Sequence, residues 1–144
     1  MISEIIAPWL YLGSVLDAHG WEGDALCVHE LLFPPMIKTS ELRIPIAYLN
    51  VHPSRMVAQI HQLNVCAGIL AAHALTKRKL LVHCMAGVER SPLTIVWYLT
   101  STGLSLDEAY ALVQRQRPQV EDRRAWLDPV DESAPIALPQ IESP

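Results

Sequence analysis

A chain of 144 residues has the length of one domain and can bury a single core. Its formal net charge of −4 and its pI near 5.8 argue against a protein that coats nucleic acid. No apolar run reaches the ~18 residues that a membrane helix needs, and the N-terminus lacks the positive region of a signal peptide. The three cysteines, Cys27, Cys66 and Cys84, are widely spaced, as expected for free thiols in a reducing compartment. We therefore expect a cytoplasmic protein that contacts neither a membrane nor nucleic acid.

The first half of the chain is predicted to form short strands with irregular connections. An apolar run at residues 10–13 ends in glycine, and a second candidate strand covers residues 25–29. Residues 33–41 contain two consecutive prolines and read as a loop. Residues 42–49 are rich in strand-forming types, but Pro45 interrupts them and indicates an edge strand or an irregular segment.

Helices dominate the second half. Apolar residues recur with helical spacing from about Pro53 to Thr76, which predicts a long helix. Leu80–Val82 then reads as a short buried strand. A second helix is expected from about Ser91 to Thr100 with Gly103 as its stop, and a capping-box pattern at residues 105–108 predicts a third. These elements indicate an α/β domain.

The segment between the buried strand and the second helix carries the chemistry. A strand–loop–helix junction directs backbone N–H groups and a helix N-terminus at one spot, which makes an anion site. Gly87 allows the loop to curl, and Cys84 at its start would be favoured as a thiolate nucleophile. Arg90 offers a planar fork to two phosphate oxygens, and Ser91 is a natural N-cap whose hydroxyl can donate to the sulfur. The predicted phosphate-binding residues are Met85, Ala86, Gly87, Val88, Glu89 and Arg90.

The pattern in Cys84–Ser91, a cysteine followed by five residues, an arginine and a serine, resembles the signature of the cysteine-dependent protein phosphatases. Other segments resemble the dual-specificity phosphatases within that superfamily. Residues 4–14 resemble the opening of their domain, and Ile44–Ile46 resembles their next strand. Residues 103–110 and 115–118 resemble their closing helix. The ordered set of segments is a more specific signal than the loop alone.

The resemblance covers residues 2–127 and implies one phosphatase-like domain, a twisted central sheet flanked by helices. Residues 128–144, which hold four prolines and several acids, are predicted to form a C-terminal tail. The family's chemistry implies that the Cys84 thiolate attacks phosphorus and that water hydrolyses the cysteinyl-phosphate, with no metal or cofactor. It also implies a phosphorylated protein or small phosphate ester as substrate, with phosphotyrosine and also phosphoserine or phosphothreonine accepted. We expect a monomer.

Most members of that family carry an aspartate general acid before the long helix, yet this chain has no Asp or Glu from Leu42 to Cys84. Two residues are candidates for the missing acid. Glu89 precedes Arg90, where the myotubularin and Sac-type lipid phosphatases carry an acid; alternatively, it points to solvent or pairs with a nearby arginine. His52 falls where the acid is expected and can donate when protonated; alternatively, it only flanks the helix.

Two other functions are alternatives. A phospho-binding pseudophosphatase with weak turnover would keep Cys84 and Arg90 and lack the acid. A rhodanese-like sulfurtransferase also uses a cysteine in an anion-binding loop, but the five-residue spacing to Arg90 disfavours it. Met85, Ala86 and Val88 supply no cation for a polyphosphorylated inositol, and the acidic pI disfavours an RNA 5′-triphosphate.

Other polar residues near these motifs have simpler interpretations. His83 is expected to order the loop by hydrogen bonding rather than to act as a base. Cys27 and Cys66 are expected to be buried fillers. Arg115 and Arg117 either brace the phosphate loop or are solvated charges at a helix end.

Overall fold

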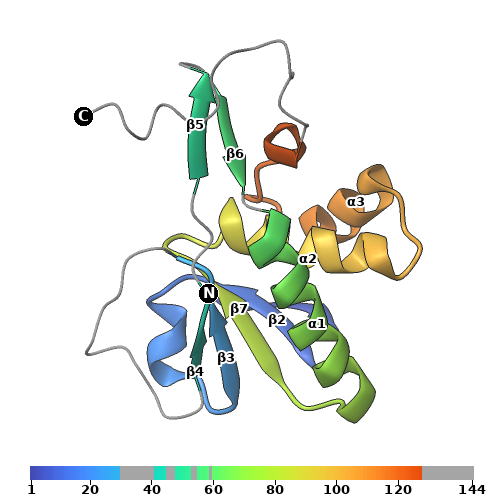
Figure 1. Cartoon of the computed structure of the whole chain (residues 1–144). Helices are drawn as coiled ribbons and strands as arrows, with labels where there is room; N and C mark the ends of the chain where they lie inside the picture. Colours follow the sequence, from blue (N-terminus) through green and yellow to red (C-terminus); the bar gives the residue numbers. More distant parts are fainter. Residues whose placement is uncertain (30–40, 45–47, 53–54, 59, 128–144) are drawn as a thin grey trace.

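A mixed sheet lies at the centre of the computed structural model, which describes residues 1–29, 41–44, 48–52, 55–58 and 60–127 (Figure 1). Within these residues its strands are β1 (Ser3–Ile6), β2 (Leu10–Gly13), β3 (Asp24–Cys27), β4 (Glu41–Arg43) and β7 (Leu80–His83). Their order across the sheet is β1-β2-β7-β3-β4. β1 and β2 are antiparallel, whereas β2, β7, β3 and β4 all run parallel. The strand that precedes the cysteine loop is therefore the central one.

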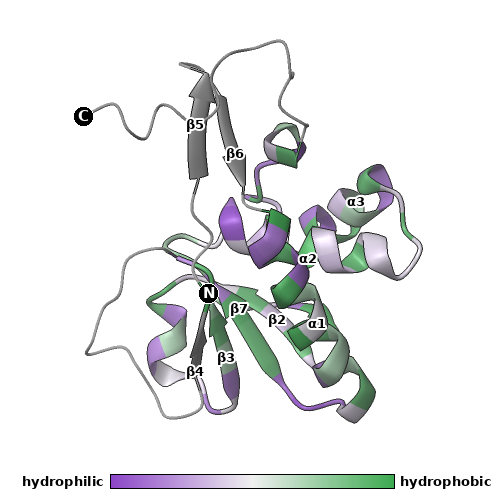
Figure 2. Ribbon diagram, in the orientation of Figure 1, coloured by the Kyte–Doolittle hydropathy of each residue, from purple (hydrophilic) through white to green (hydrophobic). Residues whose placement is uncertain are grey.

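Strand β7 is buried along its whole length because both faces of the sheet are covered. Leu80 and Val82 belong to the main core, whereas Leu81 packs with Ala18 and Ala25 on the other face. This alternation is the period-two pattern of a strand with two buried faces. Figure 2 shows the hydrophobic colour of β7 beside its neighbour β3. The predicted buried strand at residues 80–82 is confirmed.

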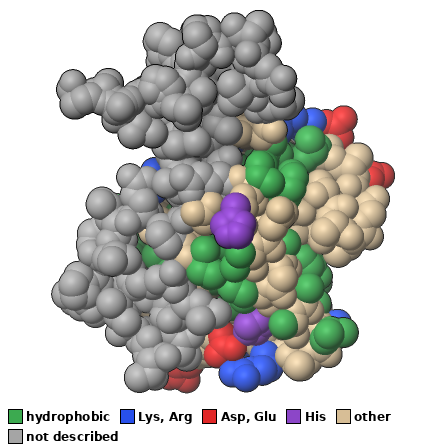
Figure 3. Space-filling model, in the orientation of Figure 1, with side chains coloured by type: hydrophobic (Ala, Val, Ile, Leu, Met, Phe, Trp, Pro, Cys, Tyr) green, Lys and Arg blue, Asp and Glu red, His purple; other side chains and the backbone are tan. Residues whose placement is uncertain are grey.

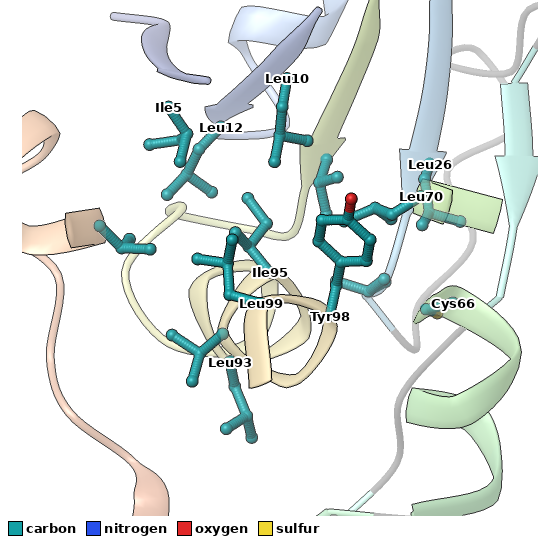
Figure 4. Packing of buried hydrophobic residues seen from close by; sticks show 14 of the residues in the cluster. Ile5, Leu10, Leu12, Leu26, Cys66, Leu70, Leu93, Ile95, Tyr98 and Leu99 are labelled. Atoms are coloured by element: carbon teal, nitrogen blue, oxygen red, sulfur yellow. The ribbon is translucent and has the colours of Figure 1, made fainter. Parts of the chain in front are cut away.

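Helices α1 (Ile60–Thr76), α2 (Arg90–Ser101) and α3 (Leu106–Gln116) pack on the face of the sheet that carries the main core. Helix α2 lies between α1 and α3 and also contacts β7. Figure 4 shows Ile95 and Leu99 of α2 close to Leu12 of β2, with Tyr98 nearer to Leu70 of α1. The short helix η1 (Asp17–Gly20) lies on the opposite face. The predicted α/β class, with helices flanking a central sheet, is confirmed.

The long helix starts later than the sequence pattern predicts. The predicted helix from Pro53 is wrong over Arg55–Ala58, which form strand β6. Strand β6 pairs antiparallel with β5 (Tyr48–His52) in a separate two-stranded sheet, and α1 begins only at Ile60. A few apolar residues in a short segment fit a helix and a strand equally well, so pairing with a partner strand decides the outcome.

Both helix ends that the sequence marks most clearly are found. Ser105 caps α3: its Oγ accepts a hydrogen bond from the Glu108 N–H at 3.1 Å, and Glu108 Oε1 accepts one from the Ser105 N–H at 2.9 Å. The predicted capping box is thus confirmed. Gly103 follows α2 with φ of 111°, a conformation that side-chain-bearing residues rarely adopt. The glycine therefore ends the helix as predicted.

The remaining predictions on the fold have mixed outcomes. The edge-strand prediction is confirmed for β4, which borders the sheet, and Cys27 and Cys66 are buried as expected. Residues 33–40 of the predicted loop, together with Pro45, Pro53 and the predicted tail 128–144, lie outside the described residues. None of the helices in the described part of the chain is long and apolar enough to cross a membrane.

We predict that Ser105→Ala lowers the free energy of unfolding by about 1 kcal/mol, because the Glu108 N–H loses its acceptor. Urea unfolding followed by circular dichroism measures this loss. Ser105→Asp is the matched control, since an aspartate accepts the same hydrogen bond and should keep most of the stability. An unchanged unfolding midpoint in Ser105→Ala would contradict the role of this cap.

Candidate active site

The predicted phosphate loop lies at the C-terminal end of the central strand. It runs from Cys84, directly after β7, to Glu89, directly before α2. Parallel strands β2 and β3 flank β7 on both sides, so their C-terminal ends meet at the same edge of the sheet. Ligands of open parallel sheets bind at that edge. Sequence analysis placed the loop correctly between the buried strand and a helix.

Four successive carbonyl groups of the loop accept hydrogen bonds from outside it. Their donors come from the segment after β2 and from the chain that follows α3. The contacts are Val15 N–H to Met85 O (3.1 Å), Arg117 Nη2 to Ala86 O (3.3 Å), Arg117 Nε to Gly87 O (2.9 Å) and Glu121 N–H to Val88 O (2.9 Å). Hydrogen bonds to its carbonyl groups therefore hold the loop along most of its length.

This arrangement fixes the direction of the loop's N–H groups. In a trans peptide the N–H points opposite to the preceding C=O, and the peptides of this loop are trans. Because the carbonyls of residues 85–88 face outward, the N–H groups of residues 86–89 face the inside of the loop. The N-terminus of α2 adds its own positive end at the same place. The backbone alone thus forms a cradle of N–H groups that could bind an anion.

Arg117 is the main support of the loop. Its side chain is buried and 3% exposed, whereas Arg115 on the same helix end is exposed. Besides the loop, Arg117 Nη1 donates to Met1 O at 2.6 Å and to Ser3 Oγ at 3.0 Å. Burial lowers the pKa of the Arg117 guanidinium, and the negative charges of Asp17 and Cys84 partly oppose that shift. Of the two arginines left open by the sequence, Arg117 braces the loop and Arg115 does not.

Gly87 is needed for the same packing. Its φ is +73°, in the left-handed region. A Cβ at this position would lie 2.6 Å from Gly13 O and 2.8 Å from Arg117 Nη2. A side chain here would displace the arginine that holds the loop, so both the backbone conformation and the packing require glycine.

Cys84 and Ser91 meet at the floor of the loop. The Cys84 Sγ lies 3.1 Å from Ser91 Oγ, and the Ser91 N–H donates to the sulfur at 3.4 Å. Ser91 is not the N-cap, contrary to expectation: α2 begins one residue earlier, with Glu89 as the N-cap, because the Leu93 N–H bonds to Glu89 O. The Ser91 side chain is thereby directed at the sulfur. By contrast, burial raises the pKa of the Cys66 thiol to about 12, which keeps it unreactive.

A cavity of about 230 Å³ opens over the sulfur. Its walls come from the loop, from the start of α2 and from the residue that lies two positions after β3. The lining residues are His29, Cys84, Met85, Ala86, Val88, Glu89 and Arg90. The structure thus brings Cys84 and Arg90 to one cavity, whereas Gly87 is not among the residues that line it.

His29 lies outside the motifs that the sequence marks as functional. The residue is 8% exposed and lines the cavity. Its signal in the sequence is its place at the C-terminal end of the predicted strand 25–29, because the strand that pairs with the cysteine strand in parallel ends at the same edge of the sheet. The sequence position of His29 indicates that it lies near the loop only once the strand order is known.

Glu89 lines the cavity but its carboxylate is held by an arginine. Arg123 Nε donates to Glu89 Oε2 at 3.0 Å, and Arg123 Nη2 donates to the same oxygen at 2.6 Å. Arg123 also pairs with Glu121, whose N–H holds Val88 O. The alternative in which Glu89 pairs with a nearby arginine is the one that the geometry favours.

His52, the other predicted proton donor, ends strand β5. Its side chain lies outside the described part of the structure. Within the described residues, no three His, Cys, Asp or Glu side chains gather where they could hold a metal ion.

Comparisons with known proteins agree with this geometry. The family model of the dual specificity phosphatase catalytic domain matches residues 30–129. This chain belongs to the dual specificity phosphatase family. The matched segment includes the whole of the loop from Cys84 to Glu89 and the start of α2, and so the predicted phosphate loop lies within the family's domain.

The chain is similar, at moderate identity, to curated dual specificity phosphatases. It is 33% identical over 126 residues to dual specificity protein phosphatase 22-B of Danio rerio, covering 78% of this chain and 63% of that protein. It is 27% identical over 125 residues to human dual specificity protein phosphatase 15, covering 81% of this chain and 41% of that protein. The chain thus spans less than two thirds of the length of these relatives.

Solved structures of the family share the fold. The crystal structure of human DUSP28 superimposes with a TM-score of 0.68 at 26% identity, covering 86% of this chain and 89% of that one. The crystal structure of DUSP15 gives a TM-score of 0.66 at 25% identity, covering 83% and 78% of the two chains.

We predict that Arg117→Lys weakens binding of inorganic phosphate about tenfold, equivalent to ~1.4 kcal/mol, because one ammonium group cannot replace both bonds to the loop carbonyls. Isothermal titration calorimetry measures the dissociation constant, and thermal unfolding checks the fold. Arg115→Lys, an exposed neighbour, is the matched control and should bind like the parent. Equal affinity in Arg117→Lys and Arg115→Lys would contradict the bracing role.

Proposed function

We propose that this chain hydrolyses phosphate monoesters through a cysteinyl-phosphate intermediate on Cys84. The observation that carries the proposal is the position of the Cys84 sulfur at the floor of a cradle of inward-facing N–H groups, 3.1 Å from the Ser91 hydroxyl. Those N–H groups match the three non-bridging oxygens of a bound phosphate. Membership of the dual specificity phosphatase family supports the same chemistry.

In the first step the Cys84 thiolate attacks phosphorus. The S–P bond forms as the ester P–O bond breaks, and the electron pair of that bond leaves on the ester oxygen, which takes up a proton. Arg90, which lines the cavity, binds two of the non-bridging oxygens with its planar fork. The groups that stabilise the charge on these oxygens are already in position, so the site needs little reorganisation during the reaction.

In the second step water attacks phosphorus and the S–P bond breaks. The electron pair returns to the Cys84 sulfur, and inorganic phosphate leaves. The Ser91 hydroxyl, which lies within hydrogen-bonding distance of the sulfur, donates to the thiolate as it re-forms. Ser91 therefore acts mainly on this step, and Cys84 and Arg90 act on both.

The proton for the ester oxygen has two candidates from the sequence, Glu89 and His52. Glu89 lines the cavity next to Arg90. Its Oε2, however, accepts two hydrogen bonds from Arg123, and a guanidinium has no acceptor for the proton of a carboxylic acid. This pairing supports Glu89 as an anchor of the loop's C-terminal end rather than as the acid.

The proposed substrates are phosphoproteins, with phosphotyrosine and also phosphoserine or phosphothreonine accepted. The side chains of Met85, Ala86 and Val88 give the cavity an apolar lining, which suits an aromatic ring or an aliphatic stem beside the phosphate. On the face drawn in Figure 3, the most evident group of Lys and Arg side chains lies at the lower edge, beside acidic side chains. Among the described residues that line the cavity, Arg90 is the one Lys or Arg side chain, which favours one phosphate group over a polyanionic ligand.

A phospho-binding pseudophosphatase is the second candidate. The absence of Asp and Glu from Leu42 to Cys84 favours it, as does the pairing of Glu89 with Arg123. Such a protein would bind phosphate and form the intermediate with an activated ester, but would turn over ordinary phosphoproteins slowly.

We expect a burst of 4-nitrophenol when the protein meets excess 4-nitrophenyl phosphate, because this leaving group needs no proton donor. Stopped-flow absorbance measures the burst and the steady rate that follows. Cys84→Ser should abolish both, and Ser91→Ala should keep the burst and slow the steady rate. Absence of a burst in the folded parent, or a burst that survives in Cys84→Ser, would overturn the proposed mechanism.

A pair of variants tests the two predicted acids. The acid should matter for an alkyl phosphate but not for 4-nitrophenyl phosphate, and its loss typically costs ~10²–10⁴-fold in rate. Steady-state rates of Glu89→Gln and His52→Asn on both substrates across pH measure this difference. Parent-like rates of both variants on the alkyl phosphate would contradict both assignments.

A further inference from the structure

His29 has a place in the cavity that neither the sequence motif nor the proposed mechanism uses. It follows β3, which pairs in parallel with β7, so the two strand ends lie side by side (Figure 1). The Val28 N–H bonds to His83 O, which ties the residue before His29 to the residue before Cys84. Among the described residues that line the cavity, His29 alone comes from outside the loop and α2.

The geometry of phosphoryl transfer explains why the position of His29 matters. The cradle takes up the three non-bridging oxygens, and in-line attack by the Cys84 sulfur leaves the ester oxygen on the side of phosphorus away from the sulfur. That oxygen therefore faces the part of the cavity that the loop backbone does not form. A proton donor must come from a side chain on another element, and His29 is such a side chain.

We propose that His29, as an imidazolium, donates the proton to the leaving ester oxygen; this inference rests on the proposed phosphatase function. As the P–O bond breaks, its electron pair on oxygen takes the proton from the His29 ring nitrogen, and the imidazole becomes neutral. In the second step the neutral imidazole accepts a proton from the attacking water. Each cycle thus restores the imidazolium and consumes one water molecule.

The charges around His29 suit this exchange. Cys84, Glu89 and Arg90 share the cavity walls with it, and His83 ends the adjacent strand. A bound phosphate dianion and the Cys84 thiolate favour the imidazolium, whereas the Arg90 guanidinium disfavours it. Histidine is the side chain that most often serves as a general acid or base, because it can hold or release a proton under physiological conditions.

The alternatives on the cavity wall are less suitable. Cys84 is the nucleophile, and Glu89 is held by two N–H groups of Arg123. As an imidazolium, the His29 side chain has ring N–H groups that can donate a proton to the ester oxygen. His29 therefore accounts for a cavity that lacks the family's aspartate and yet belongs to a phosphatase domain.

The test compares His29→Gln with His19→Gln, since His19 is exposed on η1 and does not line the cavity. We expect His29→Gln to lose about 10²–10⁴-fold in kcat on an alkyl phosphate, with KM nearly unchanged. On 4-nitrophenyl phosphate its burst should keep a rate within a few-fold of the parent, because this leaving group needs no acid, whereas the steady rate after the burst should fall, because the second step loses its base. The parent's rate on the alkyl phosphate should fall as pH rises through the imidazolium pKa, and this fall should vanish in His29→Gln. His19→Gln should match the parent throughout.

The possible outcomes distinguish a failure of the proposed phosphatase function from a failure of the proposed role of His29. A parent without any burst on 4-nitrophenyl phosphate overturns the phosphatase function and the role of His29 with it. A parent with a burst, but with parent-like alkyl rates and pH profile in His29→Gln, overturns the role of His29 alone. A loss of the burst on 4-nitrophenyl phosphate together with a lowered melting temperature also overturns it, because the two changes indicate a structural role. His29→Asn, measured in parallel, replaces His29→Gln if the glutamine variant fails to fold.

Discussion

The buried guanidinium of Arg117 is the interaction on which the site depends. It donates to the carbonyls of Ala86 and Gly87, and so turns the following N–H groups toward the inside of the loop. A charged group that is 3% exposed is costly to bury, and the cost is offset because its N–H groups find acceptors in the loop and in the first strand region. The same side chain thus joins the end of α3, the N-terminal segment and the phosphate cradle.

Much of the fold follows from local pattern. The continuous apolar run of β7, the glycine after α2 and the capping box of α3 each have one physical interpretation, and each is found. The start of α1 has no single interpretation, because residues 55–58 fit a helix and a strand equally well. Only pairing with a partner strand decides between these two structures. The strand order across the sheet also depends on pairing between distant segments, which one sequence does not encode by spacing alone.

Part of the candidate site can likewise be predicted from the sequence, and part depends on contacts between distant segments. Cys84, Gly87 and Arg90 lie within one loop, so their spacing in the sequence already implies their closeness in space. The partners of the loop lie far along the chain: Arg123 reaches Glu89 across 34 residues, and Arg117 reaches Gly87 across 30. Nothing in the sequence separates the bracing Arg117 from the exposed Arg115. Their different burial, which depends on where α3 ends over the loop, makes the distinction.

The direction of the loop's N–H groups is the claim that carries the rest, and a residue-level titration tests it most directly. Proton–nitrogen correlation spectra of the folded protein, recorded as inorganic phosphate is added, report on each backbone N–H. With inward-facing N–H groups, the signals of residues 86–89 shift the most and saturate together. Signals that stay unchanged at saturating phosphate, or largest shifts on the basic residues 77–79 at the end of α1, would contradict this direction.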